Sequence, residues 1–337
     1  MDTHPQILRL FGEPDASFFE LLFPMTPTPG TAHPWRLLLA LILVASSAFA
    51  TDRDGLFKQL HGIEGAQEIR APWLIEKLEY RTSCGKELEI RMGHLEEAGA
   101  VPFRGNILYY QGFADSMLNH DPLFTTLTDA GYRIVAFDYP GQGGSSGNMN
   151  NIDVMEITRI GDVVLERLER RTAAPGKKIT LAWSTGGLAA YLAASRQEVD
   201  AVILIAPGIH VRALVGRFGA VTLPTLTSRP VGEGDPHVDP IRPASPLLVP
   251  LFAARLLATS IRSHGWTIPA SVKGLVVLTG AKDRYVKPGP TEKTLRRQAG
   301  HFEILSMPDS LHEVDNEVDT YRLPMLQAVL TFLHQLD

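Results

Sequence analysis

After residue 75, the chain shows two different patterns of hydrophobic and polar positions. Residues 77–81 and 87–91 alternate apolar with polar positions, which is typical of antiparallel strands with one buried face. Later segments are nearly continuous apolar runs, as in strands buried on both faces of a parallel sheet. These runs span residues 106–110, 133–137, 179–183, 201–205 and 275–278, and residues 302–305 are a candidate last strand. The pattern predicts an antiparallel pair followed by a parallel sheet.

Segments with helical periodicity lie between these strands, at residues 121–130, 153–171, 187–195, 291–298 and 321–336. In the second of them, one helix face carries Val154, Ile157, Ile160, Val164 and Leu168. Strands that alternate with helices predict an α/β fold with a mostly parallel, doubly wound sheet.

The interval between the strands at 201–205 and 275–278 is too long for one crossover helix. Residues 208–270 are rich in Leu, Ala, Val and Pro, and we expect them to form an inserted helical cap over the carboxyl edge of the sheet. Residues 51–207 and 271–337 then form the core.

The first 50 residues have the pattern of a leader and signal peptide. Arg36 precedes an apolar run at residues 37–45, and small residues end at Ala48 and Ala50. The run is too short to span a bilayer stably, so we expect cleavage after Ala50 and export to the periplasm or the medium. An uncleaved N-terminal anchor is the alternative, and Met25 is an alternative translation start.

Composition narrows the function classes. The net charge of −5 and 20% charged residues give no basic excess, which argues against a nucleic-acid partner. Cys84 is the only cysteine, which excludes an intrachain disulfide and a multi-cysteine metal site.

The segment from Ala182 to Gly187 is close to the G-x-S-x-G nucleophile elbow, with Ser184 at its centre. It lies between an apolar strand and a helix, as that motif requires, although Ala182 replaces the first glycine. A serine hydroxyl is a weak nucleophile, so it must project from a tight turn where a base can reach it. The alternative is a serine that only caps the following helix.

An acid and a base follow in the order expected for this motif, which is Ser, then Asp or Glu, then His. Asp283 follows the strand at 275–278, and His312 follows the strand at 302–305. We expect His312 to take the Ser184 proton and Asp283 to orient its ring. The alternatives are a turn or helix-capping role for Asp283, and His301 as the base, although His301 precedes the last strand.

Two main-chain N–H groups would bind the oxyanion, and we assign them to Phe113 and Thr185. No cofactor or metal is expected. The glycine-rich segment 141–147 lacks the dinucleotide fingerprint, because Ser146 stands at its third small position. Asn316 stands where a zinc-protease motif beginning at His312 would need its second histidine.

The motifs together resemble the monoacylglycerol lipase, lysophospholipase and serine aminopeptidase branch of the α/β-hydrolases, over about residues 75–337. They are residues 111–113, 138–145, the elbow at Ser184, residues 280–286 and His312-Glu313. Gln111, Pro140 and Gln142 depart from the usual family pattern. The resemblance implies an α/β-hydrolase fold and ester hydrolysis through an acyl-enzyme, without a cofactor.

We therefore expect an exported serine hydrolase that acts on lipid-like or other apolar acyl esters. The apolar cap favours such substrates and a transient contact with a membrane surface, although most of its apolar residues are expected to pack within the cap itself. An aminopeptidase or amidase of the same fold is an alternative, and Glu233 or Asp235 would then bind the substrate ammonium. A non-catalytic ligand-binding scaffold is another. The sequence leaves the oligomeric state open.

Overall fold

The computed structural model describes residues 73–99, 101–170, 177–212, 227–228, 250–298 and 302–336. The predicted signal peptide and most of the predicted cap lie outside the described residues, as do Glu233, Asp235 and His301. The division into a core and a cap at residues 208–270 stays a prediction.

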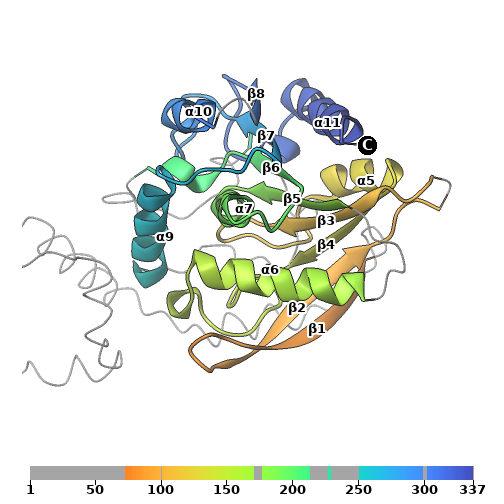
Figure 1. Ribbon diagram of the computed structural model, residues 1–337, viewed down its shortest axis with the longest axis vertical. Helices are drawn as coiled ribbons and strands as arrows, with labels where there is room; N and C mark the ends of the chain where they lie inside the picture. Colours follow the sequence, from red (N-terminus) through yellow and green to blue (C-terminus); the bar gives the residue numbers. More distant parts are fainter. Residues whose placement is uncertain are drawn as a thin grey trace, which may run out of the picture. The chain divides into compact units, whose positions relative to one another are not determined.

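An eight-stranded sheet in the order β1-β2-β4-β3-β5-β6-β7-β8 forms the centre of the described part (Figure 1). The strands β1 (Leu74–Arg81) and β2 (Glu87–Leu95) are antiparallel to each other, and β2 is antiparallel to β4. All other neighbours are parallel, and these strands are β3 (Gly105–Tyr110), β4 (Tyr132–Phe137), β5 (Lys177–Trp183), β6 (Ala201–Ile205), β7 (Lys273–Leu278) and β8 (Phe302–Ser306). The predicted antiparallel pair and parallel sheet are confirmed.

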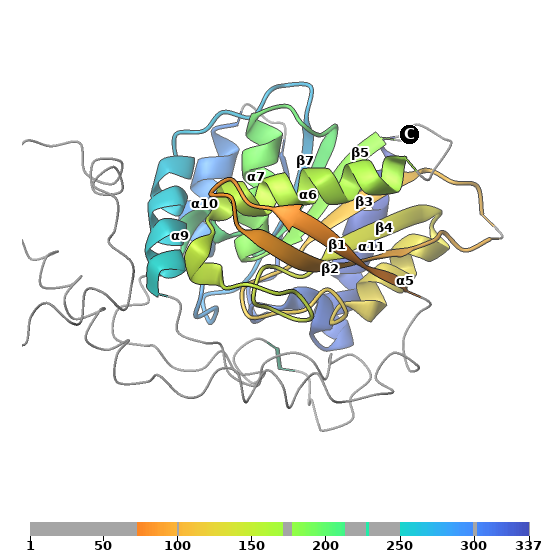
Figure 2. The same cartoon turned by 90° about the horizontal axis from the view of Figure 1, so that it is seen from below.

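Helices cover both faces of this sheet (Figures 1 and 2). The helices α6 (Val154–Glu169) and α7 (Thr185–Ser195) bury their apolar side chains in one core. The helices α5 (Asp121–Asp129) and α11 (Asp319–His334) contribute to a second core on the other face. Two layers of helices therefore enclose the parallel strands, as the continuous apolar runs predict.

Two further helices contribute buried side chains to the first of these cores. The helix α9 (Pro250–Ser263) lies in the interval where the cap is predicted, and it contacts α6 and α7. The helix α10 (Pro288–Arg296) contacts β8. It begins at Pro288, earlier than the periodicity predicts, because a proline at the first helical turn already has the helical φ.

Short 3-10 turns complete the described elements, at Met149–Asn151 (η1), Gly208–His210 (η2) and Val314–Asn316 (η3). Each connects a strand to the helix that follows it. Within the residues that the structure describes, no helix has the length and apolar character needed to cross a membrane.

Candidate active site

Ser184 occupies a sharp turn between the end of β5 and the first residue of α7. Its backbone has φ 54° and ψ −115°, a conformation that a non-glycine residue adopts only when its surroundings hold it there. The Ser184 N–H donates to the Ile205 carbonyl at 3.0 Å, and the Gly208 N–H donates to the Ser184 carbonyl at 2.7 Å. These bonds to the end of β6 and to η2 fix the turn.

The two small residues of the motif differ in how much space surrounds them. A Cβ atom at Gly186 would lie 2.2 Å from the Tyr110 carbonyl oxygen, so only glycine fits where α7 passes the end of β3. Ala182 instead lies within β5, in register with Tyr110 of β3 and Leu204 of β6. A methyl group on a sheet residue needs no special space, which explains why the departure at Ala182 is tolerated.

Ser184, His312 and Asp283 form one chain of hydrogen bonds, although β7 and β8 carry the last two residues to the site from far along the sequence. The Ser184 Oγ lies 2.7 Å from His312 Nε2, and His312 Nδ1 lies 2.7 Å from Asp283 Oδ2. His312 and Asp283 are buried, whereas Ser184 is partly exposed. The structure therefore brings together the three residues that the sequence predicts for a catalytic triad.

Asp283 has a full set of hydrogen-bond donors. Its Oδ2 also accepts from the Thr279 hydroxyl at 2.6 Å, and its Oδ1 accepts from the main-chain N–H groups of Tyr285 at 2.7 Å and Val286 at 3.0 Å. Burial by itself would raise the pKa of Asp283, but the His312 ring and these donors outweigh burial and lower the pKa to about 2. Asp283 is therefore an anion at neutral pH and keeps a proton on His312 Nδ1.

Trp183 contacts both the backbone and the ring of His312, and the sequence did not predict this contact. Its Nε1–H donates to the His312 carbonyl at 2.9 Å, and the two rings have centroids 5.3 Å apart. The Tyr285 ring lies 4.7 Å from the His312 ring. A tryptophan directly before the nucleophile can be noticed in the sequence. Its contact with His312 cannot be predicted there, because it depends on the order of strands in the sheet.

The predicted oxyanion donors belong to two segments, the loop after β3 and the start of α7. Gly112 approaches the Trp183 ring so closely that a Cβ atom there would lie 2.4 Å from it. Phe113 follows on the loop after β3, and Thr185 begins α7. The main-chain N–H groups of both residues have no hydrogen-bond partner among the described residues. Both groups are thus available to an incoming oxygen, and their role stays a prediction.

The glycine-rich segment after β4 has a structural role that the sequence did not indicate. Asp138 forms a buried ion pair with Arg91 of β2. It also accepts hydrogen bonds from the main-chain N–H groups of Met117 at 2.9 Å and Gly144 at 2.8 Å. Asp138 therefore ties the loop at residues 138–147 to the loop after β3, next to the site.

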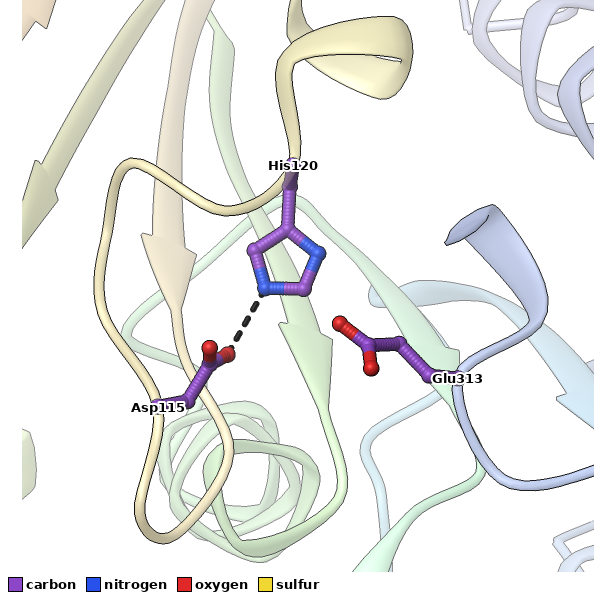
Figure 3. A group of neighbouring side chains, drawn as sticks. All are labelled: Asp115, His120 and Glu313. Carbon is purple, nitrogen blue, oxygen red and sulfur yellow. Dashed lines mark hydrogen bonds and ion pairs between the residues drawn. The ribbon is translucent and has the colours of Figure 1, made fainter. Parts of the chain in front are cut away.

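A second buried histidine lies in the loop that carries Phe113. His120 Nε2 lies 2.7 Å from Asp115 Oδ2, and His120 Nδ1 bonds to Asp315 in η3. The Glu313 carboxylate points toward the same ring (Figure 3). One potential ligand atom from each of Asp115, His120 and Glu313 lies within 4.8 Å of the others, so these residues are close enough to share a cation.

Comparison with known proteins agrees with this architecture. The family described as serine aminopeptidase, S33, matches residues 102–239, which include β3, the elbow and η2. No curated protein sequence matches the chain significantly.

Three similar solved structures carry informative names. A monoacylglycerol lipase from Paleococcus ferrophilus has 19% identity and a TM-score of 0.60, over 73% of this chain and 98% of its own. A soluble variant of the Saccharomyces cerevisiae monoglyceride lipase, bound to a substrate analogue, has 15% identity and a TM-score of 0.60, over 78% of this chain and 95% of its own. A carboxyl esterase from Bacillus coagulans, bound to glycerol, has 15% identity and a TM-score of 0.58, over 77% and 98%.

The topology and these likenesses together establish the α/β-hydrolase fold for this chain, and the predicted fold class is confirmed. Sequence identities below one fifth support a shared fold but do not identify the substrate.

Proposed function

We propose that this α/β-hydrolase is a serine hydrolase that cleaves carboxylic esters through an acyl-enzyme intermediate. The observation that carries the proposal is the continuous chain of hydrogen bonds from the Ser184 hydroxyl through His312 to Asp283. A nucleophile that is bonded to a base, which is in turn oriented by a carboxylate, is the general arrangement of activated serine enzymes.

The first half of the reaction forms the acyl-enzyme. Ser184 Oγ attacks the ester carbonyl carbon while His312 Nε2 takes its proton, and Asp283 stabilises the imidazolium that forms. The N–H groups of Phe113 and Thr185 would stabilise the negative oxygen of the tetrahedral intermediate. His312 then gives the proton to the leaving alcohol oxygen as the bond from carbon to that oxygen breaks.

Water completes the cycle by the same steps. His312 takes a proton from the water, whose oxygen attacks the acyl carbon, and it returns that proton to Ser184 Oγ when the acid leaves. Every bond and proton is then accounted for by the substrate, water and the chain's own groups.

Lipid-like or other apolar acyl esters are the proposed substrates. Similar structures are named as monoacylglycerol lipases and a carboxyl esterase, which supports this class. The Phe113 ring, on the residue whose N–H is proposed to bind the oxyanion, stacks on Phe252 of α9 with centroids 5.8 Å apart, and this apolar pair supports an apolar acyl site. We further propose export directed by residues 1–50, and a cap at residues 208–270 that meets a membrane surface transiently.

An aminopeptidase is the second candidate. The specific observation in its favour is the match of residues 102–239 to the serine aminopeptidase family. The chemistry at Ser184 would be the same, with an amine in place of the alcohol as leaving group.

Labelling with a fluorophosphonate probe tests the proposed nucleophile. We expect the wild type to be labelled on Ser184 and Ser184→Ala to lose all labelling. Ser195→Ala is the matched control, because Ser195 lies at the far end of α7 and donates only to the Leu192 carbonyl at 2.7 Å. Labelling that persists in Ser184→Ala would exclude Ser184 as the nucleophile.

A substrate panel then separates the two candidates. We expect p-nitrophenyl esters with apolar acyl chains to be hydrolysed, and aminoacyl anilides to be hydrolysed far more slowly. The reverse order would favour the aminopeptidase.

A further inference from the structure

His120 is bonded to a carboxylate at each ring nitrogen. Nε2 contacts Asp115 on its own loop, and Nδ1 contacts Asp315 in η3, 195 residues later in the sequence. The exposed fraction is 0% for His120 and Asp115 and 1% for Asp315. Water therefore does not compete with these bonds.

The arrangement determines the charge of the ring. An ionised carboxylate only accepts hydrogen bonds, so both ring nitrogens must donate, and a histidine with two N–H groups is a cation. Burial by itself would lower the pKa of His120, but Asp315 and Asp115 outweigh burial and raise it well above its usual value. His120 is thus an imidazolium at neutral pH, between two carboxylates.

The other ionisable groups that face this ring are Glu313 and Tyr109. Burial and the carboxylates of Asp115 and Asp315 raise the pKa of Tyr109 well above its usual value, so that hydroxyl stays neutral. Glu313 accepts a hydrogen bond from the Asn316 side chain at 2.8 Å. The cation thus lies beside the Tyr109 ring of β3, and its hydrogen bonds go to Asp115 of its own loop and Asp315 of η3.

The same contact joins the two loops that the proposed mechanism needs. Asp115 lies two residues after Phe113, and Asp315 lies three residues after His312. A second bond runs in parallel, because the Asn316 side chain donates to the Asn119 carbonyl at 2.8 Å. Between the loops, the Trp183 ring has its centroid 5.6 Å from the His120 ring and 5.3 Å from the His312 ring.

We propose that His120 is a positioning residue, which holds the oxyanion loop (residues 111–116) against the loop that carries His312 (residues 310–317). The inference rests on the proposed function of Ser184. Bound cations are disfavoured at this cluster, since both His120 nitrogens carry protons and have no lone pair for a metal.

We call the contact of His120 with Asp115 and Asp315 the clamp. Variants of its residues are tested by hydrolysis of a p-nitrophenyl ester, measured from pH 5 to 9. We expect His120→Gln to lower kcat/KM at pH 8 about tenfold, mostly through kcat, because alignment of the oxyanion loop matters most in the transition state. We expect Asp315→Asn, which is nearly isosteric, to lower it about threefold. His94→Gln is the matched control, because His94 is also buried beside an acid, Glu96 at 3.4 Å, but lies in β2.

The acid limb of the pH profile distinguishes a charged clamp from mere structural support. Removal of the His120 cation makes the surroundings of His312 more negative, so the acid midpoint moves to higher pH, by about 0.5 pH unit. Asp315→Asn leaves His120 with one carboxylate, as at His312, so the ring loses its second proton together with the anion and the midpoint stays close to that of the wild type. The double variant His120→Gln/Asp315→Asn, which removes both charges, returns the midpoint close to that of the wild type.

A measurement of the ring itself does not depend on activity. In protein labelled with 15N-histidine, we expect the His120 ring to show two N–H groups at pH 8 in the wild type and one in Asp315→Asn, and both signals to be absent in His120→Gln. If His120→Gln fails to fold, Asp315→Asn carries the test through the loss of one of these N–H signals.

The outcomes separate the clamp from the function on which it depends. A neutral His120 ring at pH 8 in the wild type, or an acid midpoint that does not move to higher pH in His120→Gln, would overturn the clamp while leaving Ser184 labelling intact. A wild type that is not labelled at Ser184 would overturn the proposed function, and the clamp with it.

Discussion

His312 and His120 are both buried, and both rings contact Trp183, yet their surroundings fit them for opposite tasks. His312 has a carboxylate at Nδ1 and the Ser184 hydroxyl at Nε2. His120 has a carboxylate at both nitrogens. One carboxylate orients an imidazole and leaves its other nitrogen free to take a proton, whereas two carboxylates keep a proton on both ring nitrogens at neutral pH. A base and a fixed cation can therefore lie a few ångströms from the same ring.

The two carboxylates should differ greatly in their effect on the reaction. Asp283→Asn is expected to lower kcat about 10⁴-fold, since the amide can favour the wrong tautomer of His312. Asp315→Asn is expected to have the small effect given above, because Asp315 touches no reacting group. Steady-state ester hydrolysis measures both, with Asp309→Asn as an exposed control near the site. Losses of similar size in the two variants would break the distinction between the two histidines.

The tryptophan between the rings sharpens the comparison. Trp183→Phe keeps an aromatic ring but removes the Nε1–H donor to the His312 carbonyl. We expect kcat to fall about tenfold, with a loss of about 1–3 kcal/mol in the free energy of unfolding from the unpaired carbonyl and the smaller ring. Kinetics and urea unfolding measure these, with Trp266→Phe as the control, because Trp266 stacks on Tyr191 away from the site. Unchanged kcat would show that β5 and β8 hold His312 without this bond.

The sequence predicts the sheet well because its parallel strands are buried on both faces. Apolar runs such as residues 201–205 cannot be exposed strands, and the bounds of the described strands agree closely with these runs. Helix ends are less predictable, since Thr185 begins α7 at the elbow itself, before the periodic residues start.

The three residues of the hydrogen-bonded chain could be nominated from order and position alone, because each follows the carboxyl end of a parallel strand. The Asp115–His120–Asp315 group could not, since nothing in the sequence pairs residues that lie 195 positions apart. The ion pair of Asp138 with Arg91 was likewise not predictable, because the two residues lie 47 positions apart in the sequence. Such contacts become visible only when the strand order is known.

A third histidine extends the comparison to a ring with no acid beside it. His210 of η2 stacks on His264 of α9 with centroids 3.7 Å apart, and its Nε2 lies 2.8 Å from the Thr294 hydroxyl. Burial, together with the positive charges of His264, Lys287 and Arg297, lowers the pKa of His210 to about 4. The same residue type is thus a cation at position 120 and a neutral ring at position 210.

Because this pKa is lower in the folded chain than the value of about 6.5 expected for the unfolded chain, the unfolded state binds more protons between these limits. The stability that depends on neutral His210 is complete above about pH 6.5 and is lost as the pH falls toward 4. Asp283 affects stability in a lower pH range. Its pKa is lowered in the folded chain, so the stability that it contributes is lost only as the pH falls below about 4. We expect His210→Gln, which still accepts from Thr294, to lose less stability than the wild type between pH 7 and 4.5, by on the order of 1 kcal/mol for a partly exposed ring. Urea unfolding at the two pH values measures this, and equal losses in the two proteins would show that the ring titrates as it does in the unfolded chain.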